Sequence, residues 1–171
     1  MSIAILQHTP AWVWAVFVAL IAYGLTQTRP REMGLLRVTL LPLAMIALSL
    51  SGVFRAFGHA PLALGGWAAG VGAALSFARN LVEARGARWL AASGTIHVPG
   101  SWLPLALIVG LFAVKYVAGA GLAIRPALAA DPLFAGLCGL GYGSFGGLLL
   151  ARGWGLRRLA DRSQALQTAR T

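Results

Sequence analysis

The chain is a succession of long apolar runs separated by short segments that carry proline, glycine or charge. A helix needs roughly 20 mostly apolar residues to cross a hydrocarbon core of about 30 Å. Five runs approach or exceed this length and are predicted to be helices: about residues 10–26, 35–54, 61–79, 101–124 and 131–151. The pattern therefore predicts an all-α integral membrane protein, with a five-helix transmembrane domain over residues 1–152 and a basic tail over residues 153–171.

Local capping and stop signals agree with the predicted helix ends. Asp131-Pro132 combines a capping side chain with a first-turn proline, and Ser101 is followed three residues later by another proline. The Arg125-Pro126 pair is a stop signal, because the residue before a proline avoids the helical conformation. The ends chosen from hydrophobicity are therefore supported by independent local signals.

Composition excludes an ordinary soluble domain. Hydrophobic residues make up 58% of the chain and charged residues only 11%, where a soluble domain has about a quarter charged. The formal net charge of +10 would suggest nucleic acid in a soluble protein. Here the arginines lie in short loops and in the tail beside apolar runs, so membrane topology already explains them and no nucleic-acid partner is expected.

The arginines also predict the orientation of the chain. Eleven fall on one side of the predicted helices: Arg29, Arg31, Arg37, Arg79, Arg85, Arg88, Arg152, Arg157, Arg158, Arg162 and Arg170. Only Arg55 and Arg125 fall on the other side. Because basic residues favour the cytoplasmic side, the N-terminus is predicted outside and the tail inside, in a bacterial inner membrane.

The longest connection, residues 80–100, is predicted on the cytoplasmic side between the third and fourth helices. Residues 80–92 are expected to continue as a basic interfacial helix. The alternating segment Gly94–Gly100 is expected to form a short β-hairpin or extended flap at the membrane surface. Arg85, Arg88 and His97 are its candidate interaction residues.

The tail has a helical apolar stripe formed by Leu156, Leu159, Ala160, Ser163 and Leu166. Arginines, among them Arg157 and Arg158, occupy the other faces. This pattern predicts a basic C-terminal helix that binds anionic lipid headgroups. A frayed, solubilising tail is the alternative.

Several short motifs together carry a family resemblance: Thr28-Arg29-Pro30, Leu41-Pro42-Leu43-Ala44-Met45, Gly94-Thr95-Ile96-His97-Val98, Ser101 and Lys115. In this order they resemble the CcdC-like family of small bacterial membrane proteins, and related uncharacterised inner-membrane families of the same length. The resemblance covers about residues 10–125. It implies a label of cytochrome c biogenesis that rests mainly on gene neighbourhood, and it brings no catalytic residues. A single cysteine, Cys138, argues against a direct thiol-redox role.

Lys115 falls near the middle of the fourth predicted helix, where a cation costs about 2.5–3.5 kcal/mol. No Asp or Glu lies within any predicted span to pair with it. With Tyr116 and Tyr142 nearby, Lys115 is a candidate intramembrane site for an anion or a headgroup, or one station of a polar pathway. The alternative is a lysine that snorkels toward an interface.

Gly139, Gly143 and Gly147 repeat every four residues along one face of the fifth predicted helix. Such a strip lets another backbone approach closely. Packing within the chain is favoured, against the neighbouring fourth span, and a homodimer through the strip is the alternative.

No motif for catalysis, metal binding or a cofactor is apparent. His8 and His59 share the predicted outer side, but two loop histidines without an acidic or thiol companion are weak evidence for a metal or haem site. We therefore expect no catalytic residues, no metal and no cofactor. The sequence favours a non-enzymatic assembly or accessory factor that uses its flap and tail to bind a partner protein. A small transport or permeation protein with a site at Lys115 is the alternative.

Overall fold

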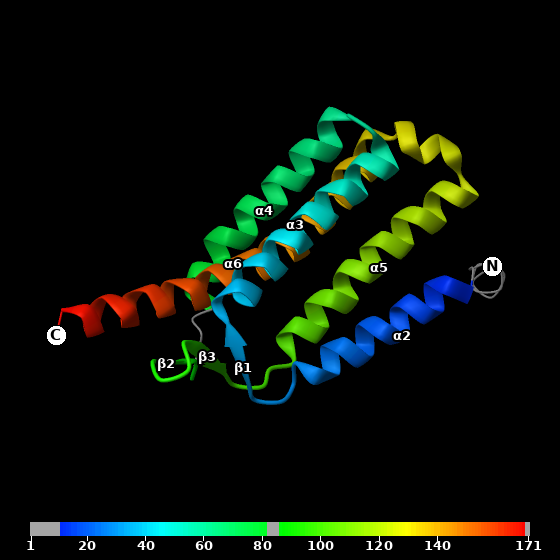
Figure 1. Cartoon of the computed structure of the whole chain (residues 1–171). Helices are drawn as coiled ribbons and strands as arrows, with labels where there is room; N and C mark the ends of the chain where they lie inside the picture. The colour runs from blue at the N-terminus through cyan, green and yellow to red at the C-terminus, as the bar shows by residue number, and fades with distance from the viewer. Residues whose placement is uncertain (1–10, 82–85, 170–171) are drawn as a thin grey trace.

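The computed structural model describes residues 11–81 and 86–169, and it is mostly helical (Figure 1). Along the chain the elements are α2 (Ala11–Thr26), β1 (Arg31–Gly34), α3 (Leu35–Phe57), α4 (Pro61–Leu81), β2 (Arg88–Leu90), β3 (Thr95–Val98), α5 (Leu103–Ile124), the 3₁₀ helix η1 (Pro126–Ala130) and α6 (Pro132–Thr168). Arg85 and His8, which the sequence singled out, lie outside the described residues.

Long apolar helices dominate the chain, as the hydrophobic pattern predicted. Within the described residues, α3, α4, α5 and α6 are each long and apolar enough to cross a membrane. Helix α2 contributes a shorter apolar stretch, Phe17–Thr26. These lengths and compositions indicate a membrane protein.

Two predicted helix starts are confirmed by their hydrogen bonds. Asp131 Oδ1 accepts the backbone N–H groups of Leu133 and Phe134 at 2.9 and 3.0 Å, and so caps α6. Ser101 Oγ accepts the N–H of Leu103 at 3.2 Å at the start of α5. The stop at Arg125 also holds, because α5 ends at Ile124.

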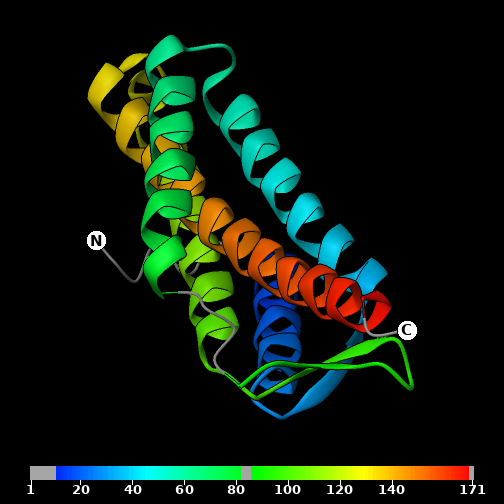
Figure 2. The same ribbon diagram turned by 90° about the vertical axis from the view of Figure 1, so that its left-hand side faces the viewer.

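Helix α6 is the centre of the bundle. It packs along α4 and α3, and α5 also contacts it, whereas α2 packs against α5 (Figures 1 and 2). The glycine strip faces α4: a Cβ at Gly139 would overlap the carbonyl of Ala63, and one at Gly143 would overlap the carbonyl of Trp67. Gly147 lies against Ala74 and Val71. The strip therefore packs within the chain, against the third predicted span and not against the fourth.

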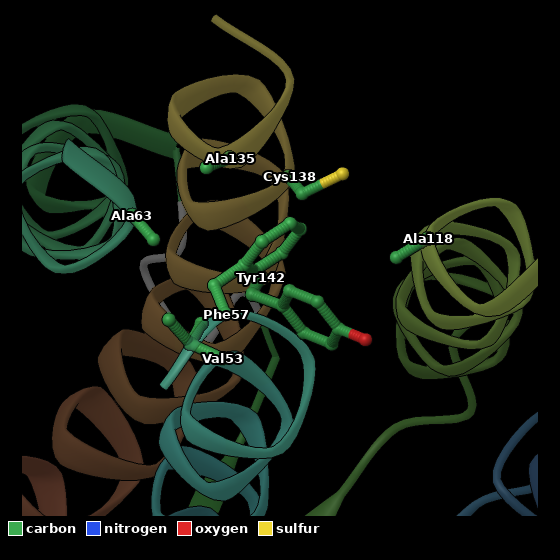
Figure 3. Packing of buried hydrophobic residues seen from close by; sticks show 7 residues of the cluster. All are labelled: Val53, Phe57, Ala63, Ala118, Ala135, Cys138 and Tyr142. Atoms are coloured by element: carbon green, nitrogen blue, oxygen red, sulfur yellow. The ribbon is translucent and has the colours of Figure 1, made fainter. Parts of the chain in front are cut away.

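A buried cluster joins α3, α4, α5 and α6 around Tyr142 (Figure 3). Its members are Val53, Phe57, Ala63, Ala118, Ala135, Cys138 and Tyr142. Next to it, Ser49 Oγ donates to the carbonyl oxygen of Tyr142 at 2.6 Å and accepts the indole N–H of Trp67 at 3.1 Å. These bonds satisfy the buried hydroxyl and tie α3 and α4 to α6.

The loops at one end of the bundle form an antiparallel sheet with the strand order β1-β3-β2. Strands β2 and β3 lie between α4 and α5 along the chain, where a hairpin was predicted. The third strand, β1, was not expected, because the segment of residues 31–34 is short and mostly polar. The predicted helix over residues 80–92 is wrong at Arg88–Leu90, which pairs with β3 as a strand.

The predicted tail is part of α6, which continues without a break past residue 152 (Figure 1). Leu156 and Ala160 are buried against Met33, Ile96 and Val98 of the sheet. Leu166, farther along, is exposed. The first part of the apolar stripe thus covers protein and does not lie free for headgroups, because the unpredicted strand completes a sheet whose apolar face needs a cover. We call the sheet and residues 153–168 of α6 the sheet platform.

Candidate functional site

The two faces of the sheet differ in chemistry because neighbouring side chains along a strand point to opposite faces. The register aligns Met33, Ile96 and Trp89 across the three strands, and Ile96 is fully buried on the face toward α6. It also aligns Glu32, His97 and Arg88 as the next row. Arg88 is exposed and His97 is half-buried, so the platform presents a polar row outward.

The arginines that were predicted to form an interaction surface on α6 have separate roles. Arg157 donates from Nη1 to Thr39 Oγ1 of α3 at 2.8 Å, and its Nε lies 3.4 Å from Asp161 Oδ1. The guanidinium of Arg158 lies 5.2 Å from the ring centroid of Trp154, a cation–π distance. Arg157 therefore joins α6 to α3, and Arg158 stays on the exposed surface of the platform.

A pocket lies between the platform and the helices, with an empty volume of about 570 Å³ that includes space open to the outside. Its walls come from α2, β1, α3, β3, α5 and α6: Tyr23, Gln27, Arg31, Met33, Arg37, Val38, Leu41, Pro42, Met45, Val98, Pro104, Ile108, Leu149, Arg152, Gly153 and Leu156. We call it the arginine pocket, because its charged lining residues are Arg31, Arg37 and Arg152.

Arg31 reaches the pocket because of its place in β1. Residues 31 and 33 share a strand face, so Arg31 lies on the same side of the sheet as buried Met33. Its guanidinium donates to Oε1 of Gln27, a buried residue at the end of α2. The carbonyl oxygen of Gln27 accepts the N–H of Ser101 at 3.1 Å, which fixes α2 to the start of α5. Burial lowers the pKa of Arg31. Tyr23 partly opposes this shift, and the charge of Arg37 adds to it.

Among the residues that the structure describes, no carboxylate lines this pocket. Glu32 lies on the other face of β1, where its Oε2 accepts the hydroxyl of Thr95 at 3.0 Å. Asp161 is the acidic residue nearest to Arg152 in sequence. Among the described residues, Asp161 forms its ion pair with Arg157. Arg152 is half-buried and feels the positive charge of Arg31. The described lining of the pocket therefore carries an uncompensated positive charge, an arrangement suited to an anion.

The three residues of the predicted intramembrane site differ in their surroundings. Lys115 is exposed on α5, and Tyr116 is half-buried and stacks on Phe112 with a centroid distance of 6.4 Å. Tyr142 belongs to the buried cluster of α6. None of the three predicted site residues lines the arginine pocket.

The described residues contain no group of three His, Cys, Asp or Glu side chains that could hold a metal ion. His59 is exposed and lies against Phe54, with a ring-centroid distance of 5.4 Å. Cys138 is buried and forms no disulfide among the described residues. The described residues thus offer the arginine pocket as the candidate binding site.

Sequence reasoning missed this pocket. Arg31, Arg37 and Arg152 were counted only as orientation signals, and Gln27 was not singled out. One signal was available: the basic residues near the first, second and fifth predicted spans greatly outnumber the acidic ones. That excess indicates that some arginines have no acidic residue to pair with. It does not show which arginines lie close together in the fold.

The comparisons with known proteins point to a family without an assigned function. Residues 1–167 match the family of unknown function DUF6622. An uncharacterised protein of Pasteurella multocida (strain Pm70) is 32% identical over 83 residues, which are 48% of this chain and 63% of that protein. The match thus spans less than two thirds of the relative's length.

No solved structure matches the chain. A CcdC-like assignment does not emerge, whereas the expectation of an uncharacterised family does agree with these matches. Because the family match extends over nearly the whole sequence, the chain belongs to the DUF6622 family of unknown function.

Proposed function

We propose that the chain is a five-span protein of a bacterial inner membrane that has no enzymatic activity of its own. In this proposal it is an assembly or accessory factor, and its sheet platform binds a partner protein on the cytoplasmic side. The resemblance to CcdC-like proteins is not needed for the proposal, because the family match carries no function.

The observation that carries the proposal is the packing of Leu156 and Ala160 of α6 against the buried face of the sheet. This packing gives the loops and the last part of α6 a common hydrophobic core, so that they form a folded surface at one end of the bundle. Arg88 and Arg158 are exposed on that surface. A partner with an acidic patch fits this charge, and anionic headgroups are the neighbours on the membrane side.

The five-span arrangement is supported by α2, which lies beside α5 and contributes an apolar stretch of its own (Figure 1). The arginine excess on the platform side supports a cytoplasmic platform. The orientation is tested by single cysteines in a Cys138→Ser background. Ser93 lies in the exposed turn of the sheet, and Ala127 lies in the exposed η1 helix at the other end.

In intact cells, a membrane-impermeant thiol reagent is expected to label Ala127→Cys and to spare Ser93→Cys until the membrane is opened. Labelling of Ser93→Cys in intact cells would contradict the proposed orientation. Equal labelling of both positions after membrane disruption is the control for reagent access.

The partner is tested by co-purification in mild detergent with quantitative mass spectrometry. A double variant, Arg88→Glu with His97→Ala, alters the polar row of the sheet and leaves its buried face intact. Arg125→Glu is the matched control, since Arg125 is exposed near η1. The double variant is expected to lose proteins that the wild type and the control retain. Identical co-purifying proteins in all three samples would overturn the platform as the interaction surface.

A further inference from the structure

We propose that the arginine pocket binds an anionic phospholipid, with its phosphate at Arg31, Arg37 and Arg152 and an acyl chain along the apolar wall beside them. This inference goes beyond the proposed function, because it does not depend on any protein partner of the platform. Three features of the pocket support it: its positive charge, its apolar wall, and the order of charged and apolar residues along its helices.

The charged end of the pocket fits a phosphate. Its three arginines come from three different elements, β1, α3 and α6, and line one pocket, which has no carboxylate among its described lining residues. Arg31 is oriented by Gln27, a neutral acceptor that leaves its charge uncompensated. Arg31 and Arg152 are half-buried, whereas Arg37 is exposed. Half-buried cations without a counter-charge are costly, and guanidinium groups bind phosphate oxygens in pairs of parallel hydrogen bonds. An incoming phosphate would supply the missing negative charge.

The apolar end of the pocket fits a hydrocarbon chain. Val38, Leu41 and Met45 follow one another along one face of α3, over about 10 Å of helix length. Ile108 of α5 and Leu149 of α6 provide further apolar lining. A small inorganic anion would leave this wall without a function, whereas an amphiphile uses both ends of the pocket.

The sequence order within the helices gives the pocket a direction. On α3, Arg37 precedes Leu41 and Met45, and α3 starts at the sheet. On α6, which approaches the sheet with its later residues, Leu149 precedes Arg152 and then Leu156, which packs on the sheet. Both helices therefore place the guanidinium near the platform and the apolar residue deeper in the bundle. A phospholipid of the adjoining leaflet has the same order of head and tail.

The test measures lipid binding to the purified full-length protein in detergent by native mass spectrometry. Phosphatidylglycerol and phosphatidylcholine with the same acyl chains are titrated in parallel. Phosphatidylglycerol is expected to bind at least about tenfold more tightly, since it carries a net negative charge, whereas the cationic choline of phosphatidylcholine offsets the phosphate charge and is repelled by the arginines. Equal affinity for the two lipids would overturn the proposal.

Variants locate the site. The double variant Arg31→Gln with Arg152→Gln is expected to lose about tenfold or more of the preference for phosphatidylglycerol. Arg125→Gln removes one exposed arginine far from the pocket in sequence and is expected to keep the wild-type preference. A full preference in the double variant would show that the lipid binds elsewhere. Thermal unfolding of each variant checks its fold.

The acyl part is tested separately by Met45→Trp, which fills the apolar end and leaves every arginine in place. It is expected to weaken phosphatidylglycerol binding, and inorganic phosphate is expected to compete poorly with the lipid. Efficient competition by inorganic phosphate, together with unchanged lipid binding in Met45→Trp, would indicate a site for a small anion and overturn the proposal. If the arginine double variant fails to fold, these measurements and the comparison of the two lipids still decide the outcome.

Discussion

The two sides of the bundle are packed in opposite ways. Where α4 meets α6, glycines lie directly against the backbone of the other helix, and even a methyl group at Gly143 would collide with Trp67. Where α3 and α6 face α2 and α5, large side chains leave a pocket between the helices. The first contact has no room for a ligand, and the second has three arginines around an open space.

This difference separates the residues that hold the bundle together from those that bind. Close backbone packing maximises van der Waals contact between helices when lipid removes most of the hydrophobic drive for their association. A pocket with unpaired cations lowers stability, because it lacks packing contacts and brings like charges together. We therefore expect substitutions on the two sides to differ in the size and in the sign of their effects on stability.

The largest effect is expected from Gly143→Leu. Its side chain would have to displace the backbone of α4, since a Cβ there lies within 3.0 Å of the Trp67 Cα. We expect a loss of more than about 3 kcal/mol and little folded protein, measured by thermal unfolding and gel filtration. Gly72→Leu on the open side of α4 is the control, because a Cβ at Gly72 meets nothing within 4 Å. A stable, folded Gly143→Leu monomer derived from a wild-type dimer would assign the strip to a homodimer instead.

A smaller loss is expected from Ser49→Ala on the same side. The hydroxyl bonds both Trp67 and the Tyr142 carbonyl, and its removal leaves the indole N–H without its partner. A cost of about 1–3 kcal/mol in the free energy of unfolding follows from one unsatisfied, partly buried donor. Ser76→Ala is the matched control, since the Ser76 hydroxyl is exposed and bonds only its own helix. Equal costs at the two serines would show that the buried network adds nothing.

The pocket side is expected to respond with the opposite sign. Arg152→Gln removes a half-buried cation that is repelled by Arg31, so lipid-free protein in neutral detergent should gain about 1 kcal/mol of stability. Adding phosphatidylglycerol should stabilise the wild type more than the variant, because a ligand stabilises the state that binds it. Thermal unfolding with and without the lipid measures both effects. A variant that is less stable under both conditions would show that Arg152 holds the bundle together.

The smallest effect is expected from Lys115→Met. Lys115 is exposed on α5 and does not line the pocket, so its removal should change stability by less than about 0.5 kcal/mol. Phosphatidylglycerol binding should also stay unchanged in native mass spectrometry. Loss of solute flux through reconstituted vesicles in Lys115→Met, with an intact fold, would favour the transport alternative over the accessory factor.

The sequence predicted the long helices well but did not single out the arginine pocket, for physical reasons. Helix length and capping are local properties, so Asp131 and the apolar runs could be recognised without the fold. Strand β1 has four residues and gains its partner, β3, from beyond two intervening helices. Its pairing, and with it the inward direction of Arg31, depends on contacts that no local pattern contains.

The two cationic sites show the same limit. Lys115 attracted attention because depth along a span can be counted, but which side of α5 it occupies depends on how the helix is rotated against its neighbours. The pocket arginines sit near span ends, where topology explains each of them singly. Their convergence follows only from the sheet and from the unbroken course of α6.

The central position of α6 has a consequence for how the protein is made. Every element that α6 packs against precedes it in the chain, so a ribosome delivers the central helix after its partners. Until then, the face of α4 that receives the glycine strip of α6 and the apolar face of the sheet have no cover. A translation product that stops before residue 132 would expose both faces, one to lipid and one to water. Such nascent chains should be preferred substrates for membrane proteases and chaperones, and completion of α6 would release them.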